Sequence, residues 1–228
     1  KNITLTSANS INIARWLAQM FYYFIAYKNR PNPHKELIVS VPSGNFGNLC
    51  AGLVAHKMGL PIKHFIACTN INDTVPRYLD SGNYEPKKSI STISNAMDVG
   101  DPSNFIRIQK LFNNDFQKLK KEISGYAFTD PQTRKAIKEI HTKSNYIADP
   151  HGALSYLGLK TYLEGLEKDT AQGIFFETAH PIKFAPTVEA TLKLKIDSPK
   201  QIEKVLAKPS LSIPISDYKS LKDFFLTR

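Results

Sequence analysis

The stretch that most constrains the fold is Glu36–Met58, ELIVSVPSGNFGNLCAGLVAHKM. Its β-forming residues Leu37–Val41 predict a short buried strand. The turn Pro42–Asn48, PSGNFGN, carries two glycines three residues apart, and from about Phe46 the apolar residues recur at helical spacing. The first free N–H groups of a helix that follows such a turn point at an anion and favour phosphate. An ordinary connection between a strand and a helix gives the same pattern, so both interpretations stay open on local grounds.

Length and composition indicate a globular chain. Its 228 residues suit one large domain or two small ones, and no run of about 18 apolar residues suggests a membrane span. The N-terminus lacks the charged-then-apolar order of a signal peptide, and it begins abruptly on a β-forming run, as if something preceded it. Cys50 and Cys68 lie in apolar segments without a partner pattern, which predicts free buried thiols in a reducing compartment. We therefore expect a cytoplasmic protein that does not engage a membrane.

The net charge of +10 raises the question of nucleic-acid binding. The lysines are scattered, however, and the densest groups, Lys118–Lys121 and Lys193–Lys195, are typical of solvated faces of helices or strands. We therefore expect no nucleic-acid partner, because a positive field around a site for phosphorylated, anionic substrates accounts for the sign of the charge. The six histidines show no spacing typical of metal ligands, so we expect no metal site.

The rest of the chain alternates between helical and strand-like segments. Strands are expected at Ile62–Cys68 and Gly173–Phe176, and a proline-bearing tail starts at about residue 195. Weaker strand signals lie at residues 87–93, 126–128 and 146–148. The alternation predicts a single α/β domain with a mainly parallel sheet flanked by helices on both faces. Ligands of such sheets bind outside the carboxyl ends of the strands. The SGNFGN turn and the turn Glu177–Pro181, ETAHP, both follow strands, so we expect them on the same edge.

A helix is expected from about Ile11 to Lys28, with Asn9 and Ser10 as candidate N-cap residues. It is apolar nearly all round, which predicts burial on several sides. Its polar exceptions share one stripe of the helix: Asn12, Arg15 and Gln19. A buried arginine needs an anionic partner, which here is either a carboxylate of the protein or a phosphate of a ligand.

Five stretches of the sequence resemble the threonine synthases, a family of pyridoxal-phosphate enzymes of the tryptophan-synthase-β fold type. They are SANSINIAR (7–15), VPSGNFGN (41–48), GLPIKHFIACTNINDTVPRYLDSG (59–82), ISNAMDVGDPSNF (93–105) and TAHPIKF (178–184). Each alone is only suggestive, but together, in the family's order and spacing, they are highly specific and cover nearly the whole chain. The chain resembles only the C-terminal portion of such an enzyme. The resemblance implies one cofactor-binding large domain over residues 1–228, with a C-terminal tail from about 195. It places the N-terminal part and the Schiff-base lysine outside this chain.

For the cofactor, the resemblance implies two groups of binding residues. The SGNFGN turn would hold the cofactor phosphate, chiefly through main-chain N–H groups of Gly44, Asn45, Phe46, Gly47 and Asn48. The hydroxyl of Thr178 would meet the pyridine nitrogen, and because a hydroxyl cannot hold that nitrogen protonated, the ring would be a milder electron sink. The family often has glycine before this threonine, whereas this chain has Glu177, which we expect to point elsewhere. We interpret His180 as a turn residue near the ring rather than a general base, and Lys183 as a helix-face lysine.

The resemblance also implies a substrate and a reaction. The SANSINIAR stretch resembles the family's site for the substrate phosphate, which points to Ser10 and Arg15, with Asn9 or Asn12 assisting. The implied lyase reaction of threonine biosynthesis converts O-phospho-L-homoserine and water to L-threonine and phosphate. The family's cofactor-bearing lysine lies in a Phe-Lys-Asp motif that does not occur in this sequence, and the nearest string, Leu221–Asp223, lies at the wrong end. We therefore expect no catalytic residue in this chain, an inactive fragment on its own, and the N-terminal half of the same enzyme as its partner.

Two alternatives stay open beside this interpretation. The first is a stand-alone binding module for a phosphate-bearing ligand, which an in-frame upstream Phe-Lys-Asp segment would argue against. The second is a related lyase of the same fold type, such as threonine dehydratase. The string NSINIAR, with Arg15, favours a phosphorylated substrate and argues against that second alternative.

Overall fold

The computed structural model describes residues 4, 6, 9–167, 169–209 and 211–227. Contacts within the chain divide it into two units, Asn9–Ile196 and the terminal segments Lys1–Ala8 with Asp197–Arg228. The larger unit holds the sheet, and the smaller contains helices α9 (Lys200–Leu206) and α10 (Tyr218–Thr227). None of the helices within the described ranges is both long enough and apolar enough to cross a membrane.

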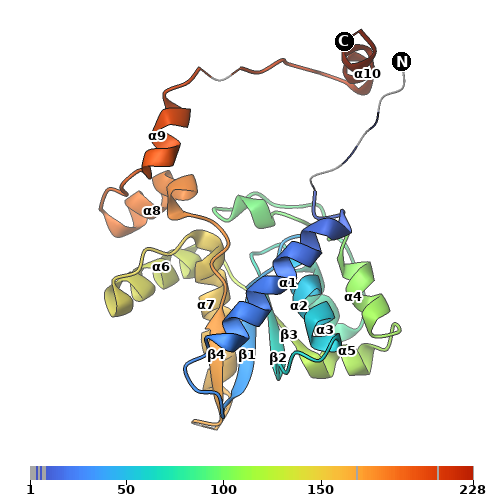
Figure 1. Cartoon of the computed structure of the whole chain (residues 1–228), viewed down its shortest axis with the longest axis vertical. Helices are drawn as coiled ribbons and strands as arrows, with labels where there is room; N and C mark the ends of the chain where they lie inside the picture. The colour runs from blue at the N-terminus through green and yellow to red at the C-terminus, as the bar shows by residue number, and fades with distance from the viewer. Residues whose placement is uncertain (1–3, 5, 7–8, 168, 210, 228) are drawn as a thin grey trace. The chain divides into compact units, whose positions relative to one another are not determined.

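The centre of the larger unit is a parallel sheet with the strand order β3-β2-β1-β4 (Figure 1). The strands are β1 (Glu36–Pro42), β2 (His64–Thr69), β3 (Ile123–Ala127) and β4 (Ala171–Phe175). β1 is bonded on both sides, so that Val39 lies opposite Phe65 of β2 and Ile174 of β4. Because all four strands run the same way, their carboxyl ends share one edge of the sheet, which is the edge where ligands bind in such folds.

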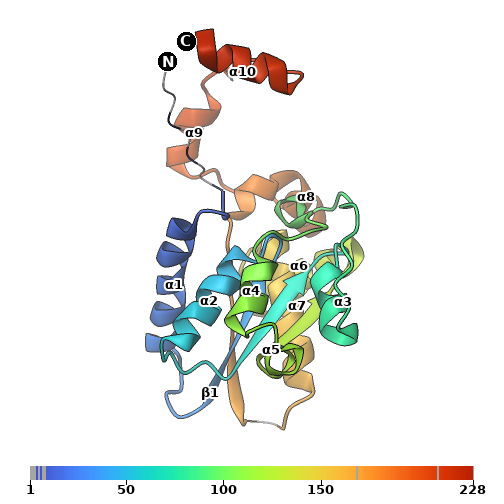
Figure 2. The same ribbon diagram turned by 90° about the vertical axis from the view of Figure 1, so that its right-hand side faces the viewer.

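Helices cover both faces of the sheet, as predicted. Helices α1 (Ile13–Lys28) and α2 (Gly47–Lys57) lie side by side (Figure 2), and α7 (Pro150–Glu164) packs on β1, β2 and β4. The alternation of side chains along β1 explains the two layers. Leu37, Val39 and Val41 belong to the core shared with α1 and α2, whereas Ile38 packs with Leu154 and Leu159 of α7. Burial on both faces is typical of parallel strands that read as continuous apolar runs.

Short elements connect the strands and helices. Between β2 and β3 lie α3 (Thr74–Ser81), the 3-10 turn η1 (Asn95–Met97), α4 (Phe105–Leu111) and α5 (Phe116–Glu122). α6 (Asp130–Ser144) precedes α7, and η2 (Pro181–Phe184) and α8 (Ala185–Leu192) follow β4. The strand signals at residues 87–93 and 146–148 are wrong, since both segments are irregular, while the signal at 126–128 falls partly in β3. The N-cap of α1 is Asn12, whose side chain accepts the N–H of Ala14 (3.0 Å), rather than Asn9 or Ser10.

The expectation that the first helix is buried on several sides is wrong for this chain. Trp16, Met20 and Tyr23 are buried against the core, but the remaining large apolar side chains of α1 are exposed. We name the exposed set the apolar face of α1; it comprises Ile13, Leu17, Phe21, Phe24 and Ile25, and Phe21 is 62% exposed. Helical periodicity identifies apolar residues but carries no information on what covers them.

Candidate active site

The two turns that the sequence singles out leave the sheet at its carboxyl edge. After β1, Ser43 donates its N–H to the carbonyl of Cys68 (2.8 Å), and after β4, Phe176 donates its N–H to the carbonyl of Ser40 (3.1 Å). These bonds extend the pairing of the neighbouring strands by one residue beyond their ends. The turn after β1 and the segment after β4 therefore start from adjacent points, as the strand order requires.

The SGNFGN turn enters α2 with an uncapped N-terminus. Phe46 is the N-cap residue, its φ is 62°, in the left-handed region, and no side chain caps the helix. The ring of Phe46 is buried and meets Phe105 edge-on at 5.6 Å between centroids, which anchors a backbone conformation that is costly for a bulky residue. The first N–H groups of α2, from Gly47 and Asn48 onward, thus lack a side-chain acceptor, and such an arrangement binds anions.

Both glycines of the turn allow a close approach of other segments. A Cβ atom at Gly44 would lie 2.7 Å from Cα of Met97 in η1, and one at Gly47 would lie 3.0 Å from Cβ of Ser10. The positive φ of the turn belongs to Phe46 and not to either glycine. The glycines are therefore required because η1 and the residues before α1 are packed against the turn.

A hydrogen-bond network joins the residues before α1 to the turn. Asn45 Nδ2 donates to Ser10 Oγ (2.9 Å), and Asn104 Nδ2 donates to the same oxygen (3.3 Å). Asn45 Oδ1 accepts the N–H of Ser103 (2.7 Å), and Asn104 Oδ1 accepts from Arg107 Nη1 (2.9 Å). Both amide side chains are fixed at their two ends, so the network positions the Ser10 hydroxyl beside the turn.

A second network fixes the loop that Gly44 touches. Asp98 Oδ1 accepts from Asn70 Nδ2 (2.9 Å) and from Thr92 Oγ1 (2.7 Å), and Asp98 Oδ2 accepts the N–H of Thr92 (3.0 Å). Because Asp98 directly follows η1, these bonds hold Met97 in place against the glycine. Asp98 therefore supports the turn indirectly, because its hydrogen bonds fix the η1 segment that packs against Gly44.

These segments enclose a cavity of about 300 Å³, which we name the carboxyl-edge pocket. It is lined by residues before and within α1, the SGNFGN turn, η1, α7, and residues after β4. The predicted site residues that line it are Ser10, Arg15, Gly44, Asn45, Phe46, Gly47, Asn48 and Thr178. Asn9 and Asn12 serve the backbone of the same segment, since Asn9 Oδ1 accepts the N–H of Ile11 (3.1 Å) and Asn12 caps α1. Three regions that are far apart in the sequence thus meet at one cavity.

Arg15 lines the pocket, but the expectation that it is buried is wrong. Its side chain is exposed, because the stripe of α1 that carries it is not covered. An exposed guanidinium needs no buried counter-charge, so burial gives no argument for an anionic ligand here. What supports an anion at Arg15 is its position beside the uncapped N-terminus of α2.

Two buried amide oxygens at the pocket have no hydrogen-bond partner among the described residues. They are Gln19 Oε1 and Asn48 Oδ1, and both side chains line the carboxyl-edge pocket. Leaving a buried acceptor unpaired costs about 1–3 kcal/mol. A polar ligand that donated hydrogen bonds to these oxygens would remove that cost.

The segment after β4 sends its side chains in different directions. Thr178 is exposed and lines the pocket, and so does the exposed Lys183 of η2. His180 is exposed, and its Nδ1 accepts the N–H of Ile182 (3.1 Å), which makes it the N-cap of η2. Glu177 points toward Gly152 of α7.

His151 is a pocket residue for which the sequence carries no signal. The segment Asp149–Gly152, DPHG, is typical of a helix start, and Asp149 does cap α7 by accepting the N–H of His151 (2.8 Å). That His151 lines the pocket depends on how α7 packs on β1 and β2, which no local pattern records. Asn104 also lies inside a recognised stretch, yet only the structure shows that it holds Ser10.

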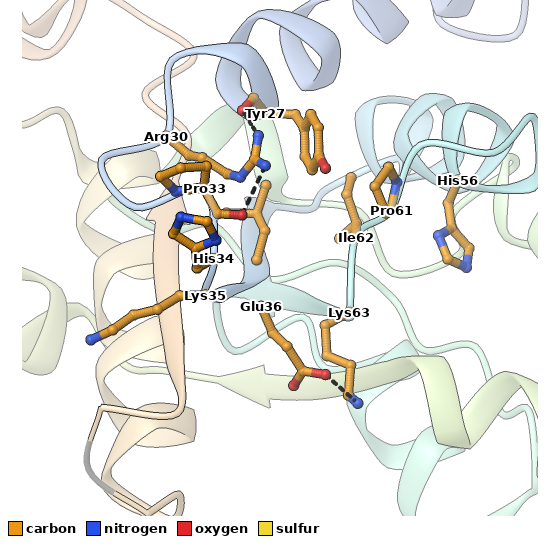
Figure 3. A pocket seen from close by; sticks show the side chains of 11 residues that line it. Tyr27, Arg30, Pro33, His34, Lys35, Glu36, His56, Pro61, Ile62 and Lys63 are labelled. Carbon is orange, nitrogen blue, oxygen red and sulfur yellow. Dashed lines mark hydrogen bonds and ion pairs between the residues drawn. The ribbon is translucent and has the colours of Figure 1, made fainter.

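A second cavity, of about 400 Å³, lies at the opposite edge of the sheet (Figure 3), and we name it the amino-edge pocket. It is formed where β1 and β2 begin and where α1 and α2 end. Arg30 donates to the carbonyls of Tyr27 (2.6 Å) and Pro33 (3.1 Å), and Lys63 Nζ lies 2.8 Å from Glu36 Oε1. Its prominent charged groups therefore already have partners within the chain.

No group of histidine, cysteine, aspartate and glutamate side chains in the described part of the chain has the arrangement of a metal site. The two cysteines, Cys50 and Cys68, are buried and free. The polar groups at the carboxyl-edge pocket are amides, hydroxyls, main-chain N–H groups and the side chains of Arg15, His151 and Lys183, which suit an anionic organic ligand.

Comparison with known proteins gives a consistent result. No protein-family model matches the chain. Threonine synthase from Buchnera aphidicola subsp. Acyrthosiphon pisum is 46% identical over 230 residues, covering 100% of this chain and 52% of that protein. The crystal structure of threonine synthase from Escherichia coli matches with a TM-score of 0.88 at 43% identity, over 98% of this chain and 51% of that one. The PLP-bound threonine synthase from Brucella melitensis matches with a TM-score of 0.83 at 31% identity, over 96% and 52% of the two chains.

The chain thus spans about half the length of the relatives it matches. A more distant likeness, to threonine deaminase from Solanum lycopersicum, has a TM-score of 0.59 at 14% identity and shows the fold alone. The dehydratase alternative is therefore not favoured.

Proposed function

This chain belongs to the threonine synthase family and corresponds to its C-terminal portion, and on that basis we propose that it binds pyridoxal 5'-phosphate and the substrate in an enzyme that converts O-phospho-L-homoserine and water to L-threonine and phosphate. The observation that carries the proposal is the composition of the carboxyl-edge pocket. The SGNFGN turn, Thr178 and Arg15, which are far apart in the sequence, line one cavity.

The residues of the turn fit the cofactor phosphate. Phe46 leads into α2 without a side-chain cap, so the N–H groups of Gly47 and Asn48 are available to an anion. A side chain at Gly44 or Gly47 would collide with Met97 or Ser10, so the glycines keep the cradle tight. The phosphate of the cofactor is therefore proposed to sit at the start of α2, held by Gly44, Asn45, Phe46, Gly47 and Asn48.

When bound, pyridoxal phosphate supplies an electron sink for the cleavage of bonds at the amino-acid substrate. Thr178 is proposed to hydrogen-bond the ring nitrogen, because its hydroxyl is exposed and lines the pocket. A hydroxyl carries no charge, so it does not hold that nitrogen protonated as a carboxylate would. The cofactor ring would then withdraw electrons less strongly. Glu177, the carboxylic acid that precedes Thr178, is directed to Gly152 instead.

The substrate phosphate is proposed to bind between Ser10 and Arg15. Ser10 Oγ accepts hydrogen bonds from Asn45 and Asn104, and its own contact to Asn9 Oδ1 is long, at 3.4 Å. A phosphate oxygen would offer the Ser10 hydroxyl a better acceptor, because bonds to charged acceptors are shorter and stronger. Arg15 adds a planar donor pair that matches two phosphate oxygens. Asn9 and Asn12 are proposed to assist by shaping the segment before α1.

We further propose that the lysine that carries the cofactor lies outside these 228 residues, in the remaining half of the same enzyme. The chain spans about half of its relatives, and α1 carries an exposed apolar face. Contiguous exposed apolar side chains mark a surface that another protein segment covers. On this proposal the rest of the enzyme packs on α1, and this chain alone is inactive. The free buried thiols of Cys50 and Cys68 suit the reducing cytoplasm, where we propose that the enzyme works.

Reductive labelling tests the proposal. The full-length enzyme is incubated with pyridoxal phosphate, reduced with borohydride and digested, and the modified lysine is mapped by mass spectrometry. We expect one stoichiometric label on a lysine outside residues 1–228, together with phosphate release from O-phospho-L-homoserine. Labelling of Lys183, the lysine that lines the pocket, would overturn the division of the site, and a Lys183→Arg variant would then lose the label. Binding without any labelled lysine or turnover would favour the stand-alone phosphate-binding module.

A further inference from the structure

A second cluster of polar groups lies at the wall of the carboxyl-edge pocket, where α7 begins. Asp149 is fully buried, and its Oδ1 accepts the N–H of His151 (2.8 Å) and lies 2.6 Å from His151 Nδ1. Asp149 Oδ2 and His151 Nε2 are buried without a hydrogen-bond partner among the described residues. The His151 ring is 3% exposed and lines the pocket, so its free nitrogen is a buried polar atom at a ligand cavity.

Glu177 completes this cluster from the end of β4. A Cβ atom at Gly152 would lie 2.1 Å from Glu177 Cδ, so the carboxyl group rests directly on the first turn of α7. Both carboxyl oxygens of Glu177 are buried, and within the described residues neither has a partner. Asp149 is the N-cap residue of that same turn, so the two acids are neighbours, and the charge of Asp149 raises the pKa of Glu177. Two carboxyl groups therefore lie together, and no arginine or lysine among the described residues is bonded to either.

Two buried carboxylates in contact cannot both keep a negative charge at low cost. Burial, and then the hydrogen bond and charge of Asp149, raise the pKa of Glu177 to about 10. Burial also opposes ionisation of Asp149, but the hydrogen bonds from His151 and Glu177 outweigh it and lower the pKa of Asp149. The proton of the pair therefore resides on Glu177, and the negative charge resides on Asp149.

We propose that Glu177 is a neutral carboxylic acid near pH 7, that it donates a hydrogen bond to Asp149 Oδ2, and that this bond positions the Asp149–His151 pair with Nε2 facing the pocket. Glu177 is thus a positioning residue that acts through Asp149. The inference goes beyond the proposed function, because it concerns the wall of the pocket whichever ligand the pocket binds.

The cluster directs a ring nitrogen at the pocket. Ionised Asp149 can only accept a hydrogen bond, so the short contact places a proton on His151 Nδ1 and leaves Nε2 to face the pocket. Nε2 accepts a hydrogen bond when the ring is neutral and donates one when the ring is protonated. The ring packs edge-on against Phe184 at 4.8 Å between centroids, which limits its rotation. The turn at the start of α2 offers N–H donors to an anion, whereas His151 Nε2 offers the ligand a further polar contact, with an ammonium or hydroxyl group when the ring is neutral and with an anion when the ring is protonated.

Infrared spectroscopy of the full-length protein tests the protonation directly. A neutral carboxylic acid has a carbonyl band distinct from the bands of a carboxylate. We expect this band near pH 7 in the unmodified protein and expect Glu177→Gln to remove it. If the two spectra are identical in that region, Glu177 is ionised and the proposal fails.

The pH dependence of stability gives a second readout. The pKa of Glu177 is higher in the folded chain than its ordinary value of 4.5, so its contribution is complete below about pH 4.5 and is lost as the pH rises toward about 10. The titratable groups that face it are Asp149, His151 and Tyr146, and the pKa of Tyr146 is itself raised by burial and by the charges of Glu177 and Asp149. We expect the melting temperature to fall between pH 5 and 9 more steeply in the unmodified protein than in Glu177→Gln. Parallel slopes would overturn the proposal.

The ring nitrogens of His151 report the positioning itself. In ¹⁵N-detected spectra we expect Glu177→Gln, whose amide can still donate to Asp149, to keep the Nδ1–H signal of the unmodified protein. We expect Glu177→Ala, which cannot donate, to shift it. An unchanged signal in Glu177→Ala would show that Glu177 only fills space and does not position the His151 ring.

The contact with Gly152 supplies a matched cross-check. Gly152→Ala places a methyl group where the Glu177 carboxyl lies, so it should shift the His151 signal and lower the melting temperature. In a Glu177→Gly background the same Gly152→Ala change meets no carboxyl and should be tolerated, since alanine favours a helix. An equal effect of Gly152→Ala in both backgrounds would exclude the proposed contact.

Discussion

The two pockets at opposite edges of the sheet differ in whether their polar groups have hydrogen-bond partners within the chain. The amino-edge pocket is the larger, at about 400 Å³ against about 300 Å³, but Arg30, Lys63 and Glu36 in it are bonded within the chain. The carboxyl-edge pocket contains the uncapped start of α2 and the unpartnered atoms of Gln19, Asn48 and His151. Unsatisfied polar groups, rather than volume, distinguish the pocket that we propose binds the ligand.

The direction of the helices explains this difference. α2 runs from the carboxyl edge, where its N–H groups are free, to the amino edge, where His56 and Lys57 occupy its last turn. The positive end of a helix dipole attracts anions, and the negative end attracts cations. Basic side chains therefore gather at both edges for opposite reasons. At the amino edge they neutralise helix ends and carboxylates, and at the carboxyl edge Arg15 adds to a site that is already positive.

The largest effect is expected from a side chain added at Gly44, where the turn packs against the main chain of η1. In the full-length enzyme Gly44→Val should weaken binding of pyridoxal phosphate about 100-fold, the upper end of the 1–3 kcal/mol that overpacking costs. The new Cβ would lie 2.7 Å from the Met97 Cα atom, and a main-chain neighbour cannot rotate away. Cofactor titration by absorbance measures the loss.

Gly165→Ala is the matched control for that change. Gly165 is the C-cap of α7 with φ of −88°, and a Cβ there would make an ordinary contact, 3.5 Å from the Tyr162 carbonyl oxygen. Cofactor affinity should be unchanged in this variant. An equal loss in both variants would mean that glycine substitution weakens binding through general instability.

A pair of arginine variants separates the two edges. Arg15→Ala should raise KM for O-phospho-L-homoserine about 30-fold, since a hydrogen bond to a charged group contributes about 1.5–3 kcal/mol. The cofactor absorbance should stay normal, because Arg15 is proposed to meet only the substrate phosphate. Arg30→Ala, at the amino-edge pocket, should leave KM within about 2-fold. A larger effect of Arg30→Ala would reverse the assignment of the two pockets.

The opposite edges should also respond oppositely to pH. His64, the first residue of β2, has its pKa lowered to about 4 by burial, so its contribution to stability is present above 6.5 and is lost as the pH falls toward about 4. Since one pKa unit corresponds to about 1.4 kcal/mol, we expect a loss of about 1–2 kcal/mol over that interval after allowing for solvent screening. Denaturant unfolding at pH 7 and pH 4.5 measures it.

His64→Gln keeps the hydrogen bond to Ser124 Oγ (2.9 Å) and should remove this acid-side loss. The contribution of Glu177 to stability has the opposite pH dependence, since it is lost as the pH rises. If His64→Gln and the unmodified protein lost stability in parallel below pH 6.5, the acid sensitivity would arise elsewhere.

The smallest effect is expected from the exposed ion pair at the amino edge. Lys63→Ala removes the partner of Glu36, but both side chains are more than half exposed, and such pairs contribute little in water. The melting temperature should change by no more than about 2 °C, and the difference should vanish in 1 M salt. A salt-independent loss would show that the amino-edge pocket depends on this pair.

Local patterns in the sequence were sufficient to predict the sheet and the SGNFGN turn. The run at Leu37–Val41 is apolar apart from Ser40 because β1 is buried on both faces, and the turn carries its own glycines. The exposure of Arg15 and of the apolar face of α1 could not be predicted in the same way. Periodicity reports which residues are apolar, whereas burial depends on which segments are present to cover them.

The cluster of Asp149, His151 and Glu177 shows a second limit of prediction from sequence. Asp149 and His151 belong to a helix start, and Glu177 follows a strand that lies more than twenty residues later. Their meeting depends on α7 packing across β1 and β4, and on Gly152 leaving room for a carboxyl group. The residues that such packing brings together carry no shared spacing that a sequence could reveal.

The central claim is that the start of α2, at the carboxyl edge, binds the cofactor phosphate. The most direct measurement is a titration of ¹⁵N-labelled full-length protein with pyridoxal phosphate, followed by amide chemical shifts. We expect the largest shifts at the N–H groups of Gly47 and Asn48, and we expect the amide signals of Arg30 and Lys63 to stay unchanged. Largest shifts at Arg30 and Lys63, with Gly47 and Asn48 unmoved, would contradict it.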